Sequence, residues 1–252
     1  MSPRGKRSRG AKLPLPASHL RAWGVGPRAE RGPRPALSLA RIVEAAVAVA
    51  AADGLESVSM ARVAGALDVA TMSLYRYVRA KDELLALMMD SAFEPAPPPA
   101  DPREGWRRGL SRWARAHLDV LRRHPWVVRI PLSGPPILPN QVGWMERGLA
   151  CLAKTGLSER EKLFALLLVN GFVRNEALLA LDLQRSARAA GAARDRAMAS
   201  YGDLLARLVD RERFPAITAL VDAGVFTGKD VVDEEFDFGL ERILDGVKAL
   251  MP

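Results

Sequence analysis

The run Pro95-Ala96-Pro97-Pro98-Pro99 restricts the fold of this 252-residue chain more than any other feature. Proline has no backbone N–H, and its ring clashes with the preceding turn of a helix, so a helix cannot pass through such a run. We therefore predict a boundary here. One helical unit ends at Glu94, and a second unit occupies residues 101–252.

The residues before this boundary show helical periodicity. Apolar residues recur at helical spacing after Ser38, which is a good N-cap, and Gly54 follows as a stop signal. Ser59 is a second good N-cap, and two acidic residues after Lys81 favour a helix start there. We expect four helices, over about 39–53, 60–67, 71–78 and 81–94.

The residues after the boundary are helical by the same criterion. No segment of the chain shows the alternation of a half-buried strand, so we predict an all-α fold. The stretch 163–169 is apolar on every side, so it must be covered by its own bundle or by another chain. The expected helices run from Trp106 to Pro125, from about Val142 to Gly156, from Ser158 to about Leu183, over 195–213, over 215–221, and from Phe236 to Leu250.

The net charge of +8 comes from the first 37 residues. Residues 1–37 hold nine basic side chains and one acidic side chain, whereas the remaining chain holds 28 of each. Prolines and glycines distributed through residues 1–37 break any amphipathic helix there. We predict a flexible cationic leader that is attracted to phosphates or to an anionic membrane surface.

Composition and motifs exclude several other classes. The single cysteine, Cys151, excludes a disulfide framework and is typical of a small buried apolar residue in a reducing, cytoplasmic setting. No uninterrupted apolar run reaches the ~18 residues of a membrane helix. The three histidines lack metal-pair spacing, and no phosphate loop, nucleophile elbow or carboxylate pair is present, so we expect no metal, no cofactor and no enzymatic activity.

Three short helices with a tight break at Asp68 and Val69 predict a helix-turn-helix over about residues 59–78. In this motif the third helix enters the major groove of DNA. Residues 71–81 carry Arg76, Arg79 and Lys81 and no acid, although residues 38–94 as a whole hold five basic and eight acidic side chains. Positive charge is therefore concentrated where the groove would lie.

The same residues resemble a known family. The strings SMARVAGALDV (59–69), MSLYRYV (72–78) and KDELL (81–85) are similar to the DNA-binding domain of the tetracycline-repressor (TetR) family. The strings at 156–158, 170–172 and 238–241 are similar to the C-terminal ligand domain of the tetracycline-repressor branch. The resemblance implies an N-terminal three-helix helix-turn-helix domain with a connecting helix over 38–94, followed by a helical bundle for ligand binding and dimerisation.

By position, the resemblance implies a set of DNA contacts, and arginine suits guanine while hydroxyls and lysine suit phosphates. Asp68 stands where the family usually has glycine, and aspartate visits the left-handed region more readily than most residues. Ala61 stands where the best-known member has an arginine contact, so Arg62 or the leader could substitute. The expected DNA-binding residues are Arg62, Thr71, Met72, Ser73, Tyr75, Arg76, Tyr77 and Lys81.

The resemblance also implies a homodimer and an effector pocket. The apolar helix after Ser158 and the heptad-like seam after Phe236 are the interface candidates, with packing inside one chain as the alternative. The pocket candidates are aromatic and polar residues that could equally form plain core. The expected interface residues are Leu167, Phe236, Leu240, Ile243 and Val247. The expected pocket residues are Trp106, Trp113, His117, Trp126, Asn140, Trp144, Phe164, Asn170 and Phe172.

These expectations describe a ligand-responsive transcriptional regulator. Its expected partners are double-stranded operator DNA, a second copy of the chain and a small-molecule effector. A repressor is favoured over an activator. His124 matches a magnesium ligand of the tetracycline-binding member, but the matching glutamate position is Leu179, so tetracycline–magnesium recognition is not implied. The alternative is a helical interaction module whose basic leader binds RNA or an anionic membrane.

Overall fold

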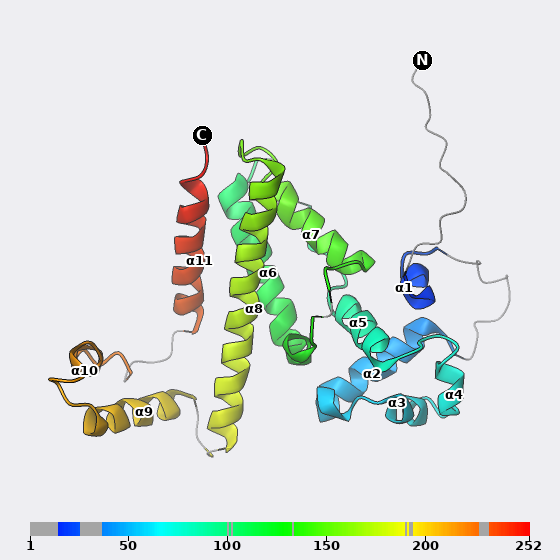
Figure 1. Ribbon diagram of the computed structural model, residues 1–252, viewed down its shortest axis with the longest axis horizontal. Coiled ribbons are helices and arrows are strands. Elements are labelled where there is room, and N and C mark those ends of the chain that lie inside the picture. The colour runs from blue at the N-terminus through cyan, green and yellow to red at the C-terminus, as the bar shows by residue number, and fades with distance from the viewer. Residues whose placement is uncertain are drawn as a thin grey trace. The chain divides into compact units, whose positions relative to one another are not determined.

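The computed structural model describes residues 15–25, 37–99, 101, 103–132, 134–189, 191, 194–226 and 232–252 (Figure 1). Every regular element in these residues is an α-helix or a 3-10 helix, which confirms the predicted all-α fold. The chain forms two compact units. The first comprises residues 1–96 and 130–143, and the second comprises residues 97–129 and 144–252.

The first unit is built around α2 and α5. The expected caps are confirmed: the Ser38 hydroxyl accepts from the Arg41 N–H at 3.3 Å, and the Ser59 hydroxyl accepts from the Arg62 N–H at 3.1 Å. α2 packs against α3 and α5 over a core that includes fully buried Ile42. The elements are α1 (Ala17–Ala22), α2 (Leu39–Asp53), η1 (Leu55–Ser57), α3 (Met60–Ala66), α4 (Thr71–Leu74) and α5 (Lys81–Ala92).

Helix α1 corrects the prediction that residues 1–37 lack a helix; most other residues of this leader lie outside the described ones. The stretch 17–23 contains neither proline nor glycine, so it can form a short helix once tertiary contacts stabilise it. The Ser18 hydroxyl donates to the Glu83 carboxylate, and the Trp23 indole N–H donates to the Ile137 carbonyl at 2.8 Å. These bonds attach α1 to the first unit.

The segment 130–143 also differs from the prediction, which placed it in the second unit. Its Ile130 and Leu138 side chains are buried, and the Gln141 N–H donates to the Asp90 carboxylate at 3.0 Å. The proline run marks the end of α5, but nothing comparable in the sequence marks the later return of the chain to the first unit. α7 (Pro139–Cys151) therefore begins in the first unit and ends in the second.

The second unit is organised around α8, which lies between α6 and α11 (Figure 1). Ser158 and Glu161 form a reciprocal capping box, with the Ser158 N–H donating to the Glu161 carboxylate at 2.8 Å and the Glu161 N–H donating to the Ser158 hydroxyl at 3.3 Å. The elements are α6 (Trp106–Arg123), η2 (Pro125–Arg129), the end of α7, α8 (Glu159–Ala189), α9 (Arg194–Leu208), α10 (Pro215–Asp222) and α11 (Val232–Lys248).

The predicted interface seam on α11 is largely buried by packing inside the chain. Phe236, Leu240 and Val247 are buried, and α11 packs on α8. The Phe236 ring stacks on the Phe172 ring at 5.4 Å, and a Cβ on Gly239 would come within 2.6 Å of Phe172. In the single chain these three side chains are covered by its own packing, which favours the alternative of packing inside one chain over their assignment to a dimer interface. A heptad-like pattern identifies an apolar face but not the helix that covers it. Ile243 is half-buried.

The opposite face of α8 is apolar and exposed. By length and composition alone α8 could cross a membrane, although its apolar residues do not form the uninterrupted run that the sequence prediction required. Only 28% of its most apolar 18-residue window is buried in the chain. The large exposed apolar side chains of α8, which we call the α8 stripe, are Leu163, Phe164, Leu167, Leu168 and Leu179.

Candidate nucleic-acid interface and effector region

The break between α3 and α4 is a tight left-handed turn. Asp68 has a φ of 53°, which confirms that aspartate can take the place of glycine there. The Val69 N–H closes the turn by donating to the Ala64 carbonyl at 3.1 Å. The predicted helix-turn-helix is therefore present, with α3 and α4 held at a fixed angle by one short loop.

Helix α4 and the residues that follow it, 71–78, place some side chains in the core and leave others exposed. Leu74 and Val78 are fully buried, whereas Met72 is 73% exposed, Tyr75 is 41% exposed and Arg76 is exposed. Leu74 and Val78 thus belong to the core of the first unit. The exposed side chains contribute little to stability in this geometry, so they are available to a partner.

Regular α-helix ends at Leu74 rather than at the predicted Val78. The Tyr77 and Val78 N–H groups both donate to the Leu74 carbonyl, at 2.8 and 2.9 Å, so the chain turns tightly there. The Arg79 N–H then donates to the Glu83 carboxylate at 2.7 Å instead of continuing the helical ladder. The side chain of Glu83, in the first turn of α5, thus binds the backbone just before α5 begins.

Tyr77 has a partner that the sequence analysis did not expect. Its hydroxyl donates to the Leu37 carbonyl at 2.9 Å, and the Arg21 guanidinium lies 5.8 Å from the centre of its ring. The hydroxyl proton is therefore used within the chain. In this conformation the side chain fastens the residues before α2 to the segment after α4, and the expected contact of Tyr77 with DNA stays a prediction.

The remaining predicted DNA contacts lie around α4. Thr71 and Ser73 are half-buried, and Lys81 is exposed at the first position of α5. Arg62 forms an exposed ion pair with Asp53, at 2.6 Å, so a contact between Arg62 and DNA would require exchange of this partner. Because exposed ion pairs contribute little to the free energy of folding, exchanging Asp53 for a DNA phosphate would cost little stability.

Three of the predicted pocket residues lie together in the second unit. The rings of Trp113, His117 and Trp144 meet edge to face, with centroids 5.1, 5.6 and 6.1 Å apart. The Trp113 indole N–H donates to the Trp144 carbonyl at 2.9 Å. This arrangement, which we call the aromatic cluster, joins α6 to the middle of α7, and all three side chains are buried.

Burial determines the protonation of the cluster. Loss of solvation, and secondarily the positive charge of Arg174, lowers the pKa of His117 to about 4. His117 is therefore neutral at physiological pH, and a neutral imidazole has one donor and one acceptor nitrogen. Burial also lowers the pKa of Arg174, whose guanidinium donates to the Val128 carbonyl at 2.9 Å.

The other predicted pocket residues have different surroundings. Trp126 is buried 5.7 Å from the His124 ring, and Phe172 packs on α11. Phe164 is 53% exposed, and Asn140 lies on α7 four residues before Trp144. The assignment of these residues to an effector pocket stays a prediction. Trp106 and Asn170 are half-buried.

Two contacts hold α7 at its two ends. Near its start, Asp90 is buried and accepts from the Gln141 N–H; burial raises the pKa of Asp90, while hydrogen bonds from Gln141 and Asn140 lower it. Near its end, Gly148 has no space for a side chain, because a Cβ there would meet Leu166 of α8. Neither contact was predicted, because each joins residues that are far apart in the sequence.

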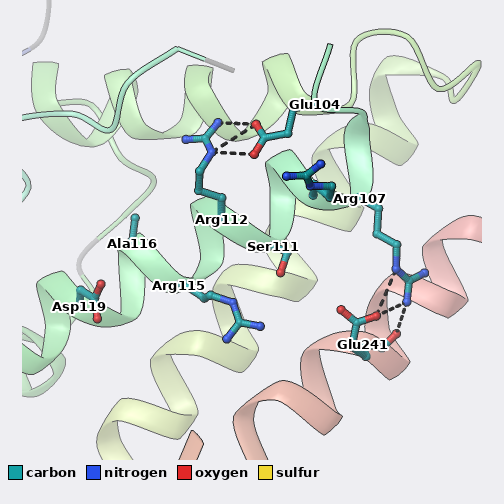
Figure 2. A pocket seen from close by; sticks show the side chains of 9 residues that line it. Glu104, Arg107, Ser111, Arg112, Arg115, Ala116, Asp119 and Glu241 are labelled. Carbon is teal, nitrogen blue, oxygen red and sulfur yellow. Dashed lines mark hydrogen bonds and ion pairs between the residues drawn. The ribbon is translucent and has the colours of Figure 1, made fainter. Parts of the chain in front are cut away.

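An arginine-rich hollow of about 610 Å³ lies between α6 and α11, and the sequence analysis had not predicted it (Figure 2). Arg107 pairs with Glu241 and, at 2.7 Å, with Asp245, while Arg112 binds Glu104 at 2.8 Å. The hydrogen bond from Arg112 lowers the pKa of Glu104. Acidic partners thus neutralise much of the positive charge of this surface, which we call the α6–α11 hollow.

Comparisons with known families match both units of the chain. The family described as bacterial regulatory proteins, tetR family, matches residues 42–88. The family described as tetracyclin repressor-like, C-terminal domain, matches residues 98–251. The two matches agree with the resemblance that the sequence motifs indicated for each part of the chain.

Individual relatives agree with the family matches. The HTH-type transcriptional repressor DrrR1 of Streptomyces coeruleorubidus is 39% identical over 233 residues, which cover 91% of this chain and 84% of DrrR1. The crystal structure of apo ActR from Streptomyces coelicolor is similar with a TM-score of 0.72 and 28% identity, covering 86% of this chain and 97% of ActR. ActR in complex with actinorhodin gives a TM-score of 0.71 and 29% identity, covering 87% and 98%.

Proposed function

The chain belongs to the tetracycline-repressor (TetR) family of bacterial transcriptional regulators, and from this premise we propose that it is a cytoplasmic, ligand-responsive repressor. It binds a near-palindromic operator as a homodimer, and a small-molecule effector releases it. Two recognition helices related by a two-fold axis read half-sites separated by one or more helical turns of DNA, about 10 base pairs each.

The exposed face of α4 is the observation that carries the proposal. Leu74 and Val78 fix the segment to the core, while Met72, Tyr75 and Arg76 extend into solvent. Residues 71–81 include three basic side chains and no acid. An arginine in this position can bond to guanine in the major groove, and an exposed methionine can contact a thymine methyl group.

The α8 stripe supports the homodimer. Its large apolar side chains are between 37% and 56% exposed in the single chain. A monomeric soluble protein rarely exposes a contiguous apolar patch of this kind, and a two-fold axis would cover it with the same patch of a second copy. Leu167 therefore remains an interface candidate, now with its exposed neighbours on α8 rather than with the buried seam of α11.

The aromatic cluster supports an aromatic effector. Edge-to-face rings around a neutral histidine favour a flat, largely apolar molecule with one or two hydrogen-bonding groups. ActR binds actinorhodin, and an effector of similar aromatic character is our proposal for this chain. Ring separation or side-chain rotation must open the cluster, because its three rings are packed together without a ligand.

Helix α7 offers a route from effector to DNA. It carries Trp144 of the aromatic cluster, and Gln141, about one turn earlier on the same helix, is bonded to Asp90 of α5. α5 begins directly after the segment that follows α4. An effector that prefers one position of α7 would shift the population of α5 positions, provided that it binds the two states with unequal affinity.

Selection of bound duplexes from a random-sequence library by the full chain tests the DNA function. We expect a two-fold symmetric consensus that survives physiological salt, and Arg76→Ala should weaken binding to it by about tenfold to a hundredfold while relaxing one position of each half-site. Arg213→Ala, an exposed substitution in the second unit, is the matched control. Equal binding to all duplexes would instead favour the interaction-module alternative.

Sedimentation equilibrium tests the dimer. The double substitution Leu167→Glu and Leu168→Glu should produce monomers, because four buried charges would face one another across the two-fold axis. Leu208→Glu, at another highly exposed apolar residue, is the control and should remain dimeric. A stable dimer of the double variant would place the interface elsewhere.

A further inference from the structure

A groove of about 390 Å³ in the first unit lies between α1 and the segment after α4. Its two charged side chains are Arg21 of α1 and Arg76, and both are exposed. None of the described residues that line it carries a carboxylate. The lining is completed by Leu37, Ser38, Leu39 and Tyr77.

Arg21 is held in place by α1 rather than projecting from a loose leader. Its guanidinium lies over the Tyr77 ring, and the Tyr77 hydroxyl is bonded to the Leu37 carbonyl. α1 is attached on either side of Arg21, by Ser18 to Glu83 and by Trp23 to Ile137. The short helix therefore positions one guanidinium beside the recognition segment.

The charges of this groove are not neutralised by neighbours. Within the described part of the chain, neither Arg21 nor Arg76 forms an ion pair. The nearby Glu83 carboxylate already accepts from the Ser18 hydroxyl and the Arg79 N–H, and it is not part of the groove lining. The α6–α11 hollow is different, since its arginines Arg107 and Arg112 each bind a carboxylate.

We propose that Arg21 binds a backbone phosphate of the operator, next to the base pair that Arg76 reads. The planar guanidinium suits bidentate bonding to phosphate oxygens, and stacking on Tyr77 leaves its N–H groups at the edge directed outward. The inference rests on the proposed function and adds to it a DNA contact from outside the helix-turn-helix. Through Arg21, α1 thereby adds one phosphate contact in each half-site.

The chemistry of Arg21 can be separated from its packing by two substitutions. Arg21→Met keeps an unbranched side chain against Tyr77 but removes the charge, and Arg21→Lys keeps the charge but loses the planar fork. Arg213→Met is the matched control, because Arg213 is also an exposed arginine whose guanidinium lies over an aromatic ring, 5.1 Å from the centre of Phe214 in the second unit.

The measurement is the affinity of the full-length variants for the duplex obtained by selection, over a series of salt concentrations. Arg21→Met should weaken binding about tenfold and reduce the slope of log K against log salt by about 0.9 per protomer, or roughly 2 per dimer. Arg21→Lys should retain the slope. An ethylation-interference experiment should identify one phosphate in each half-site whose ethylation inhibits binding of the wild type but does not inhibit binding of Arg21→Met.

Several results would overturn the proposal. An unchanged salt slope for Arg21→Met, with Arg76→Ala still defective, would reject the phosphate contact and leave the proposed function intact. A loss shared equally by Arg21→Met and Arg213→Met would show a general charge effect. Failure to select any specific duplex would reject both proposals. If Arg21→Met lowered binding to phosphatidylglycerol vesicles but not to DNA, the partner of Arg21 would be a membrane.

Discussion

Aromatic and basic side chains occur both around α4 and on α6, but they are exposed around α4 and are buried or paired with acidic residues on α6. Around α4, Tyr75 and Arg76 are exposed, and no acidic side chain lines the adjoining groove among the described residues. On α6, Trp113 is buried in the aromatic cluster, and Arg112 is bound to Glu104. Aromatic and basic side chains therefore indicate a binding surface only where the fold leaves them exposed and without internal partners.

The difference has a physical origin. The short helices of the first unit use only a few apolar side chains to pack, so the others face solvent. α6 packs against α8 and carries a second row of arginines, which acidic residues of α11 and of the preceding loop neutralise (Figure 2). Removing side chains from each region should therefore give opposite patterns of stability and DNA binding.

The largest expected contrast is between two aromatic residues. Trp113→Ala should lower the free energy of unfolding by about 3–5 kcal/mol, because it leaves a cavity and removes the donor to the Trp144 carbonyl. Tyr75→Ala should change stability by less than about 0.5 kcal/mol while weakening binding to the selected duplex. Urea unfolding and DNA titration of both variants provide the comparison, and a destabilised Tyr75→Ala would remove the distinction.

The second contrast is a pH dependence confined to the aromatic cluster. Between pH 6.5 and about 4 the unfolded chain protonates His117 but the folded chain does not, so the folded state loses stability as the pH falls through this window. From pH 7 to pH 5 the loss attributable to His117 is about 2 kcal/mol.

Urea unfolding of the wild type and of His117→Gln at both pH values checks this effect. The difference between the two proteins isolates His117 from other titrating groups such as His124 and Asp90. The part of the pH dependence of unfolding that is due to His117 should be absent from His117→Gln, whatever the stability of that variant at pH 7. Parallel pH profiles would mean that His117 is protonated in the folded protein or is not buried.

The smallest contrast is between two arginines. Arg112→Gln removes a partly exposed ion pair and should cost less than about 1 kcal/mol, without changing DNA affinity. Arg76→Gln should leave stability unchanged and weaken specific binding. A loss of DNA affinity in Arg112→Gln, at equal stability and dimerisation, would indicate that the α6–α11 hollow also contacts DNA.

Local rules predicted the first unit well. The Ser38 and Ser59 caps, the left-handed Asp68 turn and the burial of Leu74 and Val78 depend on residues a few positions apart, and the structure confirms all of them. These features are encoded by short-range hydrogen bonds and by helical spacing. The family resemblance rests on the same short stretch.

Features that depend on distant packing were not predicted. α1 is stabilised by Glu83 and Ile137, which are far away in the sequence, and the segment 130–143 returns to the first unit without a sequence signal. Periodicity identified the apolar face of α11 but not α8 as the helix that covers it. Sequence spacing likewise suggested the aromatic cluster without showing which other side chains surround it.

The two contacts of α7 limit the ways in which this helix can move. A shift along its axis would pull the Gln141 N–H away from the buried Asp90 carboxylate at one end. The same shift would bring a residue with a side chain to the place where only Gly148 fits beside Leu166. Tilting about Gly148 keeps its close packing on Leu166 and moves only the Gln141 end of the helix, so an effector that acts through Trp144 would act as a torque on the single bond to Asp90.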